Sequence, residues 1–79
     1  MKANILAFGI AKEIFGASTI KIDFPNDAVR DLKKVLETKY PRLKQIKSYM
    51  VAVNNEYAAD ELLLNEEDEI AIIPPVSGG

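Results

Sequence analysis

The sequence predicts an α+β fold, in which a mixed sheet has one main helix packed on one face. Residues 28–40 repeat apolar side chains at helical spacing, whereas four other segments show the alternation or the short apolar runs typical of strands. The runs near the two ends of the chain are apolar on both faces, as in strands near the middle of a sheet. With 79 residues, the chain has room for one domain.

The first two strands are expected to form an antiparallel hairpin. Residues 2–10 are apolar on both faces, and residues 18–24 alternate apolar with polar side chains, as in a half-solvated strand. Residues 11–16 between them are too few for much more than one helical turn, and Gly16 is a suitable left-handed terminator for it.

The main helix should begin directly after the hairpin. Pro25 ends the second strand, Asn26 or Asp27 is expected as the N-cap, and Pro41 ends the helix. The apolar stripe of this helix covers about one third of its surface, as expected for a helix that lies on a sheet. We interpret it as core, formed by Ala28, Val29, Leu32, Val35, Leu36 and Tyr40.

Two more strands and a short segment complete the predicted sheet. After a polar connection with room for another helical turn, residues 49–53 form the third strand, and Asn54-Asn55 makes a tight turn into a short segment at 56–58. A further turn should bury Leu62 or Leu64. The last strand, residues 69–73, should pair in parallel with the first, because the helix between them crosses one face of the sheet.

This order of elements is that of the β-grasp (ubiquitin-like) fold. We predict a β-grasp domain over residues 1–73 and a flexible tail over residues 74–79, because neither Pro74 nor Pro75 can donate to a strand ladder. The tail ends in Gly78-Gly79, which tolerates almost any backbone conformation. Its carboxylate can therefore be presented inside the active site of another protein, at a reach of about 20 Å.

The composition excludes several kinds of chemistry. The chain has no His and no Cys, so it lacks the residues for a Ser-His-Asp or Cys-His site, the usual metal sites and a disulfide. A net charge of −2 disfavours a nucleic-acid binder, and the longest apolar run, residues 5–11, is too short to span a membrane. We expect no metal, no nucleic acid, no membrane, no independent catalysis and a cytoplasmic location.

Charge is divided unevenly along the chain. Residues 1–47 hold all ten basic and five acidic residues, a net charge of +5, while residues 48–79 hold seven acids and no base. Six of the ten residues from 60 to 69 are acidic. We hypothesise that Glu66, Glu67 and Asp68 meet a basic partner surface, which raises the association rate and fixes orientation. The alternative is a solvated loop that aids solubility.

One helix covers only one face of such a sheet. Strand side chains on the other face, either Leu6, Phe8 and Ile10 or their alternates, should therefore stay exposed unless a partner covers them. We interpret this face as the interface of a permanent partner subunit, with Phe8 as a contact. Self-association through the same face is the competing explanation.

Over its whole length the chain resembles the MoaD/ThiS sulfur-carrier family. The resemblance rests on Ala11-Lys12-Glu13-Ile14-Phe15-Gly16, Ala52-Val53-Asn54-Asn55-Glu56, Asp68-Glu69-Ile70-Ala71-Ile72-Ile73 and above all Pro74-Pro75-Val76-Ser77-Gly78-Gly79. It implies that an E1-like activating enzyme adenylates Gly79 with ATP, that a sulfur-donor system converts it to a thiocarboxylate, and that the large subunit of molybdopterin synthase uses the sulfur to build the dithiolene of molybdopterin.

The resemblance also implies roles for the rest of the tail and for the assembly. Gly78 is the permissive neighbour of Gly79, and Pro74, Pro75, Val76 and Ser77 contact the partner that receives the tail. The chain binds no cofactor itself, the catalytic residues lie on the large subunit, and the two subunits form a heterotetramer.

Two other functions stay open. A sulfur carrier for thiamine synthesis or tRNA thiolation would have the same fold and chemistry, although residues 74–77 favour the molybdopterin branch, because thiamine carriers more often approach their glycines differently. A β-grasp interaction module would bind through its sheet or its acidic loop and have an inert tail. Deletion of Gly79 separates the two classes, because only a carrier would lose its function.

Overall fold

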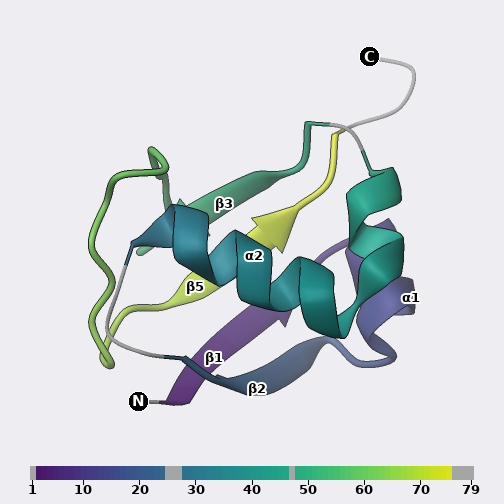
Figure 1. Cartoon of the computed structure of the whole chain (residues 1–79), viewed down its shortest axis with the longest axis horizontal. Helices are drawn as coiled ribbons and strands as arrows, with labels where there is room; N and C mark the ends of the chain where they lie inside the picture. Colours follow the sequence, from purple (N-terminus) through teal and green to yellow (C-terminus); the bar gives the residue numbers. More distant parts are fainter. Residues whose placement is uncertain (1, 25–27, 47, 76–79) are drawn as a thin grey trace.

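The computed structural model describes residues 2–24, 28–46 and 48–75, and it confirms the predicted α+β class (Figure 1). A five-stranded mixed sheet has the strand order β2-β1-β5-β3-β4, and helix α2 lies across one of its faces. The elements are β1 (Lys2–Ala7), α1 (Ile10–Phe15), β2 (Thr19–Asp23), α2 (Val29–Lys39), the 3-10 helix η1 (Pro41–Gln45), β3 (Met50–Val53), β4 (Glu56–Tyr57) and β5 (Ile70–Ile73).

The two doubly apolar strands lie side by side near the middle of the sheet, as predicted. Strand β5 is the central strand, and it pairs in parallel with β1, with Ile5 opposite Ile70. β1 also pairs with β2 in an antiparallel hairpin, and β5 pairs with β3 in antiparallel fashion. This topology is that of the predicted β-grasp fold.

The prediction that the first strand continues to Ile10 is wrong. β1 ends at Ala7, and Ile10 is the first residue of α1. Gly9 has φ 55° and ψ −131°, a conformation open mainly to glycine, and it turns the chain out of the sheet. The predicted end of the helical turn is confirmed, because Gly16 is left-handed at φ 76° and its N–H donates to the carbonyl of Lys12 at 3.0 Å.

Helix α2 begins without the predicted side-chain cap. Its N-cap residue is Ala28, whose side chain has no atom that could cap the helix, so the expectation of Asn26 or Asp27 at this position is wrong; residues 25–27 themselves lie outside the described residues. The N–H groups of Val29 and Arg30 instead donate to backbone carbonyls of a distant loop, those of Leu62 at 2.9 Å and of Asp60 at 3.0 Å. The loop thus satisfies donors that the helix leaves open.

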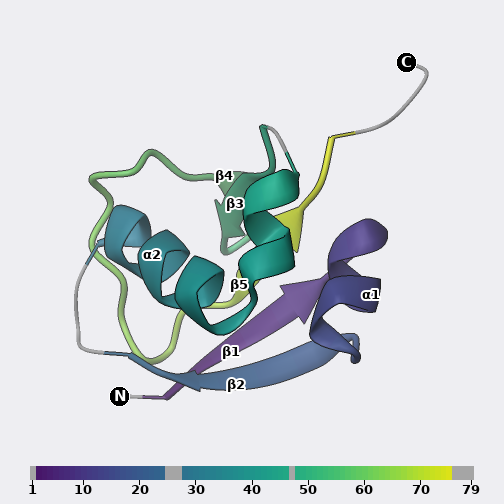
Figure 2. The same ribbon diagram turned by 45° about the vertical axis from the view of Figure 1, so that its right-hand side comes forward.

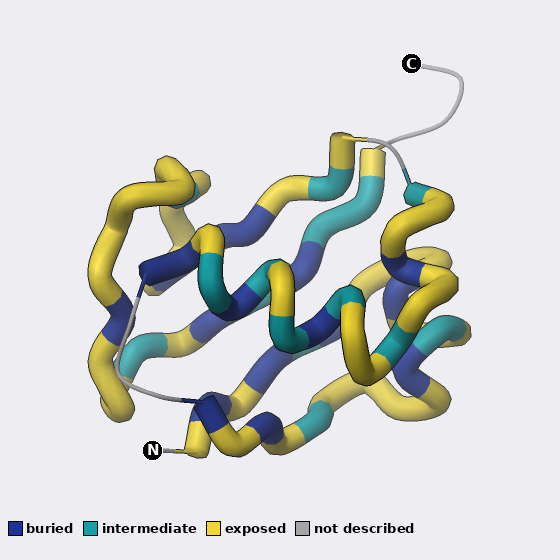
Figure 3. Tube along the Cα trace, viewed as in Figure 1, coloured by how far each residue is buried: buried dark blue, intermediate teal, exposed yellow. Residues whose placement is uncertain are grey.

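The core lies between α2 and one face of the sheet (Figure 3). The helix stripe is core as predicted, with Leu32 and Leu36 fully buried, and Leu64 rather than Leu62 is the leucine that the loop buries. The Asn54-Asn55 turn is also confirmed, with φ of 54° and 68° at its two residues. The further helical turn allowed for after α2 is η1, which begins at Pro41.

Candidate functional site

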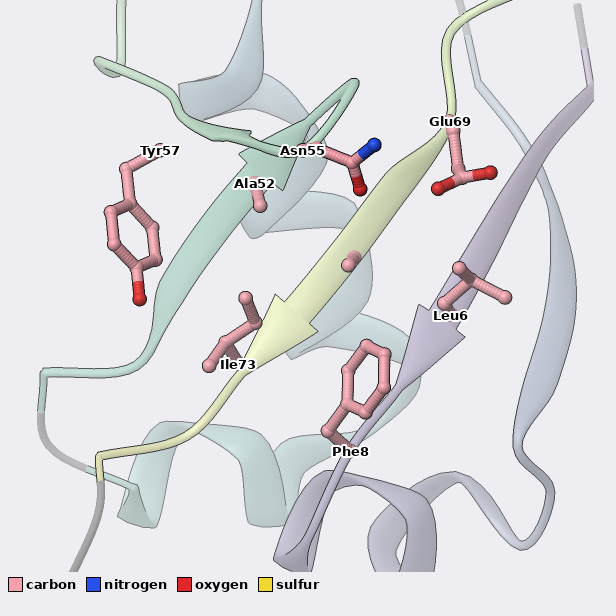
Figure 4. Close-up of a pocket in the computed structure, with 8 residues that line it drawn as sticks. Leu6, Phe8, Ala52, Asn55, Tyr57, Glu69 and Ile73 are labelled. Atoms are coloured by element: carbon pink, nitrogen blue, oxygen red, sulfur yellow. The ribbon is translucent and has the colours of Figure 1, made fainter.

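The sheet face opposite α2 is open and apolar. Because Ile5 and Ile72 are buried beneath the helix, their neighbours Leu6, Ala71 and Ile73 point to the other side. They line a groove of about 300 Å³, which is drawn in Figure 4. The other side chains that line it are Phe8, Ala52 of β3, Asn55 in the turn, Tyr57 of β4 and Glu69.

The structure settles which of the two predicted sets of strand side chains is exposed. Leu6 and Phe8 lie on the open face, and Phe8 is 50% exposed. Ile10 does not belong to this set, because it lies on α1. Tyr57, at the far edge of the face, is 65% exposed. A contiguous apolar surface of this kind is a candidate interaction site, since monomeric proteins seldom leave a large one uncovered.

The tail begins at the edge of the same face. Ile73, the last residue of β5, lines the groove, and Pro74 follows it half-buried while Pro75 is exposed. Residues 76–79 lie outside the described residues, so the roles of Val76, Ser77, Gly78 and Gly79 stay predictions.

Gly9 is a residue at the base of the tail that the sequence reasoning did not single out. A side chain at this position would put its Cβ 3.1 Å from Cγ of Pro74, so the glycine leaves room for the proline ring. The predicted parallel pairing gave no register, so it could not place this residue. In the structure Ala7 lies opposite Ile72, and two further residues along each chain bring Gly9 beside Pro74.

The predicted acidic contacts do not all have the same surroundings. Glu66 and Glu67 are exposed. Asp68 is half-buried and bonds within the chain: its Oδ1 accepts from Nδ2 of Asn54 at 3.0 Å and its Oδ2 from the N–H of Asn65 at 2.8 Å. The Asp68 carboxylate therefore orders its own loop, while Glu66 and Glu67 present charge at the surface.

The acidic segment borders the open face at the end away from the tail. A second hollow there is lined by Asn4, Leu6, Thr19 and residues 66–69. Figures 1 and 2 both show the loop before β5 on the opposite side of the molecule from the end of β5, where the tail begins. One continuous surface thus runs from the acidic loop, across the apolar groove, to the base of the tail.

The two groups with shifted pKa values both lie beside α2. The Tyr49 hydroxyl donates to Oε2 of Glu37 at 2.5 Å, and burial, followed by this bond, raises the pKa of Tyr49 above its usual range. Lys33 Nζ lies 2.8 Å from Oδ1 of Asp60, and this bond lowers the pKa of Asp60. Neither pair touches the groove, so both serve to join the helix to the rest of the fold.

Within the described ranges, no group of three or more acidic side chains is arranged to hold a metal ion. None of the helices in the same part of the chain is long and apolar enough to cross a membrane.

Comparison with known proteins identifies relatives that extend along nearly the whole chain. The model of the ThiS family matches residues 5–79. The chain is 40% identical over 81 residues to the molybdopterin synthase sulfur carrier subunit of Dictyostelium discoideum, an alignment that covers 96% of this chain and 94% of that protein.

Two solved structures are similar over the full length of both chains. SAMP1 from Haloferax volcanii has a TM-score of 0.84 at 28% identity, with 100% of each chain covered. A chain in the complex of subunits 1 and 2 of the molybdopterin-converting factor from Helicobacter pylori has a TM-score of 0.72 at 25% identity, again with 100% of each chain covered.

Proposed function

The chain belongs to the ThiS family, and on that premise we propose that it is the sulfur carrier subunit of a molybdopterin synthase. The observation that carries this proposal is the match to relatives of that name, at 40% identity over 96% of the chain in the Dictyostelium protein. The family match also runs through the terminal glycines, to residue 79. The reacting group is then the carboxyl of Gly79.

The proposed chemistry changes one atom at the end of the tail. A carboxylate is a poor electrophile, so one of its oxygens first attacks the α-phosphorus of ATP on the E1-like adenylating enzyme, and pyrophosphate leaves. Hydrosulfide released by the sulfur donor then attacks the carbonyl carbon of this acyl adenylate, AMP leaves with the bridging oxygen, and the S–H proton is lost to solvent. The product is a thiocarboxylate at Gly79, whose sulfur is a better nucleophile for building the dithiolene.

The open face supports a lasting partnership with the large subunit of the synthase. A subunit that covers the groove around Leu6, Phe8 and Ile73 receives the tail in the same docking event, because the tail starts at the edge of that groove. Glu66 and Glu67 at the far end of the face would orient it by meeting a basic surface. We propose a heterotetramer of two small and two large subunits, working in the cytoplasm, where ATP is supplied.

Intact-mass spectrometry tests the carrier function directly. The purified chain is incubated with ATP, a sulfur donor and the E1-like adenylating enzyme of the same organism, and we expect a mass gain that equals the exchange of one oxygen for sulfur, localised to Gly79. A chain that lacks Gly79 is the matched control and should gain nothing. No gain in the complete chain would refute the proposal.

The same purified proteins also distinguish the proposed function from its two alternatives. A carrier for thiamine or tRNA thiolation would gain sulfur but would not yield molybdopterin when combined with the large synthase subunit. An interaction module would bind its partner equally well with and without Gly79, and it would gain no sulfur.

A further inference from the structure

Glu69 brings a negative charge into the apolar groove of the open face. Among the described residues that line this groove, it is the only one with a charged side chain. It directly precedes β5 and is exposed. It also lines the second hollow beside residues 66–68, so it lies where the apolar groove meets the acidic loop. Glu69 has no role in the function proposed above.

The backbone of Glu69 is held by the turn between β3 and β4. Its N–H donates to Oδ1 of Asn54 at 3.0 Å, and its carbonyl accepts from the N–H of Asn54 at 2.8 Å. The next residue, Ile70, is fully buried and pairs with Ile5 of β1. The Glu69 side chain therefore starts from a fixed point at the edge of the groove, and a partner meets its carboxylate without reordering the backbone.

No cation among the described residues pairs with the Glu69 carboxylate. Within these residues the one ion pair joins Lys33 to Asp60, beside α2. Lys21 of β2 also lies on the open face, since it is opposite Asn4, two residues before Leu6. Lys21 nevertheless forms no ion pair with Glu69. Among the described residues, none takes the place of solvent around this carboxylate.

Docking of a subunit on the groove removes that solvent. Apolar neighbours such as Leu6 and Ala71 gain from being covered, whereas burial of a carboxylate without a hydrogen-bonded counter-charge is costly. A partner that covers the apolar part of the groove must therefore supply a cation where it meets Glu69. A surface that puts an apolar side chain at this point is rejected.

The groove is asymmetric, with one polar and one apolar end. Figure 4 shows Asn55 and Glu69 at one end, and Phe8 and Ile73 toward the other. The tail starts after Ile73, at the apolar end. A partner cation held at the polar end therefore sets which way round the carrier lies on its partner, and hence where the tail enters.

We propose that the large synthase subunit places a cationic side chain, Lys or Arg, against Glu69, and that this ion pair orients the carrier and excludes surfaces that lack the cation. The inference rests on the carrier function, because it concerns the subunit that receives the tail. Glu69 is then the specificity-determining residue of the groove, whereas Glu66 and Glu67 act at its rim.

The test compares three variants that change the net charge equally. Glu69→Gln alters the groove, Glu67→Gln alters its acidic rim, and Glu61→Gln alters an exposed position that lines neither hollow. Surface plasmon resonance follows binding to the organism's own large subunit at low and high salt. For Glu69→Gln we expect a Kd about thirtyfold higher, chiefly through faster dissociation. Glu67→Gln should instead slow association at low salt, and Glu61→Gln should bind like wild type.

Glu69→Leu distinguishes a partner cation from a partner apolar side chain. If an apolar side chain faced this position, leucine would bind more tightly than glutamate. With a cation there, we expect Glu69→Leu to bind at least as weakly as Glu69→Gln, because the cation is left buried and unpaired. In molybdopterin formation from the thiocarboxylate form, Glu69→Gln should raise the KM for the carrier and leave kcat unchanged, because Gly79 is intact.

The possible failures are distinguishable. If the wild-type carrier gains no sulfur, or gains it but does not bind the large subunit, the proposed function is wrong and the ion-pair proposal falls with it. If wild type gains sulfur and binds while Glu69→Gln behaves like Glu61→Gln, only the ion-pair proposal is wrong. Binding of Glu69→Leu that is as tight as that of wild type, or tighter, would also overturn it.

Discussion

Single residues with unusual backbone or solvation hold the loops of this small fold in place. Asn54 has φ 54°, and its side chain bonds both to Asp68 and to the N–H of Glu69, each at 3.0 Å. The Asn54 N–H also donates to the carbonyl of Glu69 at 2.8 Å. The tight turn and the acidic loop are therefore one bonded unit at the entrance to β5.

Asn54→Ala should destabilise the fold by about 1–3 kcal/mol, because it removes the bonds to Asp68 and Glu69 and because alanine tolerates the left-handed backbone conformation less well than asparagine. Urea unfolding measures the loss. Asn55→Ala, at φ 68°, is the control for the backbone contribution. Equal losses in the two variants would show that the side-chain bonds of Asn54 contribute nothing.

Tyr49 should make stability sensitive to alkaline pH. Burial and the bond to Glu37 raise the pKa of Tyr49 in the folded state above the value of about 10 that holds in the unfolded chain. The stabilisation that the Tyr49 hydroxyl gives the folded state is therefore complete below pH 10 and is lost as pH rises through the raised pKa. Between about pH 10 and 12, the free energy of unfolding should fall more steeply for wild type than for Tyr49→Phe. Parallel pH profiles would contradict the assigned cause.

At the scale of elements, the sequence predicted those features that depend only on a local residue pattern. Helix α2, the left-handed end at Gly16 and the Asn54-Asn55 turn each follow from periodicity or from residue type within a few positions. The start of α2 could not be predicted in this way, because carbonyls of residues 60 and 62, which lie 30 and 33 residues along the chain from their donors, accept the first N–H groups of the helix. The end of β1 was missed because apolar Ile10 continues the strand pattern while Gly9 breaks it.

The loop that caps α2 depends on one buried leucine. Leu64 is 1% exposed, whereas its neighbour Leu63 is 69% exposed. Leu64→Ala should therefore lower the free energy of unfolding by about 2–5 kcal/mol through lost burial and a cavity. Leu63→Ala, the matched control, should change it by less than about 0.5 kcal/mol.

Hydrogen exchange checks whether that leucine also holds the cap. The N–H groups of Val29 and Arg30 should lose protection in Leu64→Ala at conditions where both variants remain folded, since their acceptors lie in the displaced loop. Unchanged protection of these two groups would show that the hydrogen bonds at the start of α2 do not depend on the packing of Leu64.

At the scale of the whole molecule, the site depends on which residues the fold brings to one surface. An exposed sheet face was predicted because one helix covers only one side of a sheet. Which side chains lie on that face depends on the strand register, and only the structure shows that they are Leu6 and Phe8. Asp68 was assigned to a partner because its charge is visible in sequence, whereas its bond to Asn54 joins positions 14 residues apart. Glu69 was not singled out, because only the register places its side chain in the groove.

Phe8→Ala tests the open face as the interface with the large synthase subunit. Phe8 is 50% exposed in the free carrier, so its truncation should change the stability of the carrier little, whereas in the proposed complex it removes an aromatic contact within the groove that the large subunit covers. Loss of such a contact typically weakens binding by about 2 kcal/mol, roughly thirtyfold in Kd. Isothermal titration calorimetry with the large subunit measures the change.

The control for this prediction is Leu63→Ala, which removes a more exposed apolar side chain whose backbone pairs with Ala28 beside α2, away from the open face. Its Kd should equal that of wild type. The competing explanation, self-association through the same face, predicts instead a concentration-dependent dimer of the carrier alone that Phe8→Ala abolishes, with sedimentation velocity as the readout. Such a dimer, together with unchanged affinity for the large subunit, would reassign the face from the synthase interface to contact between two carriers.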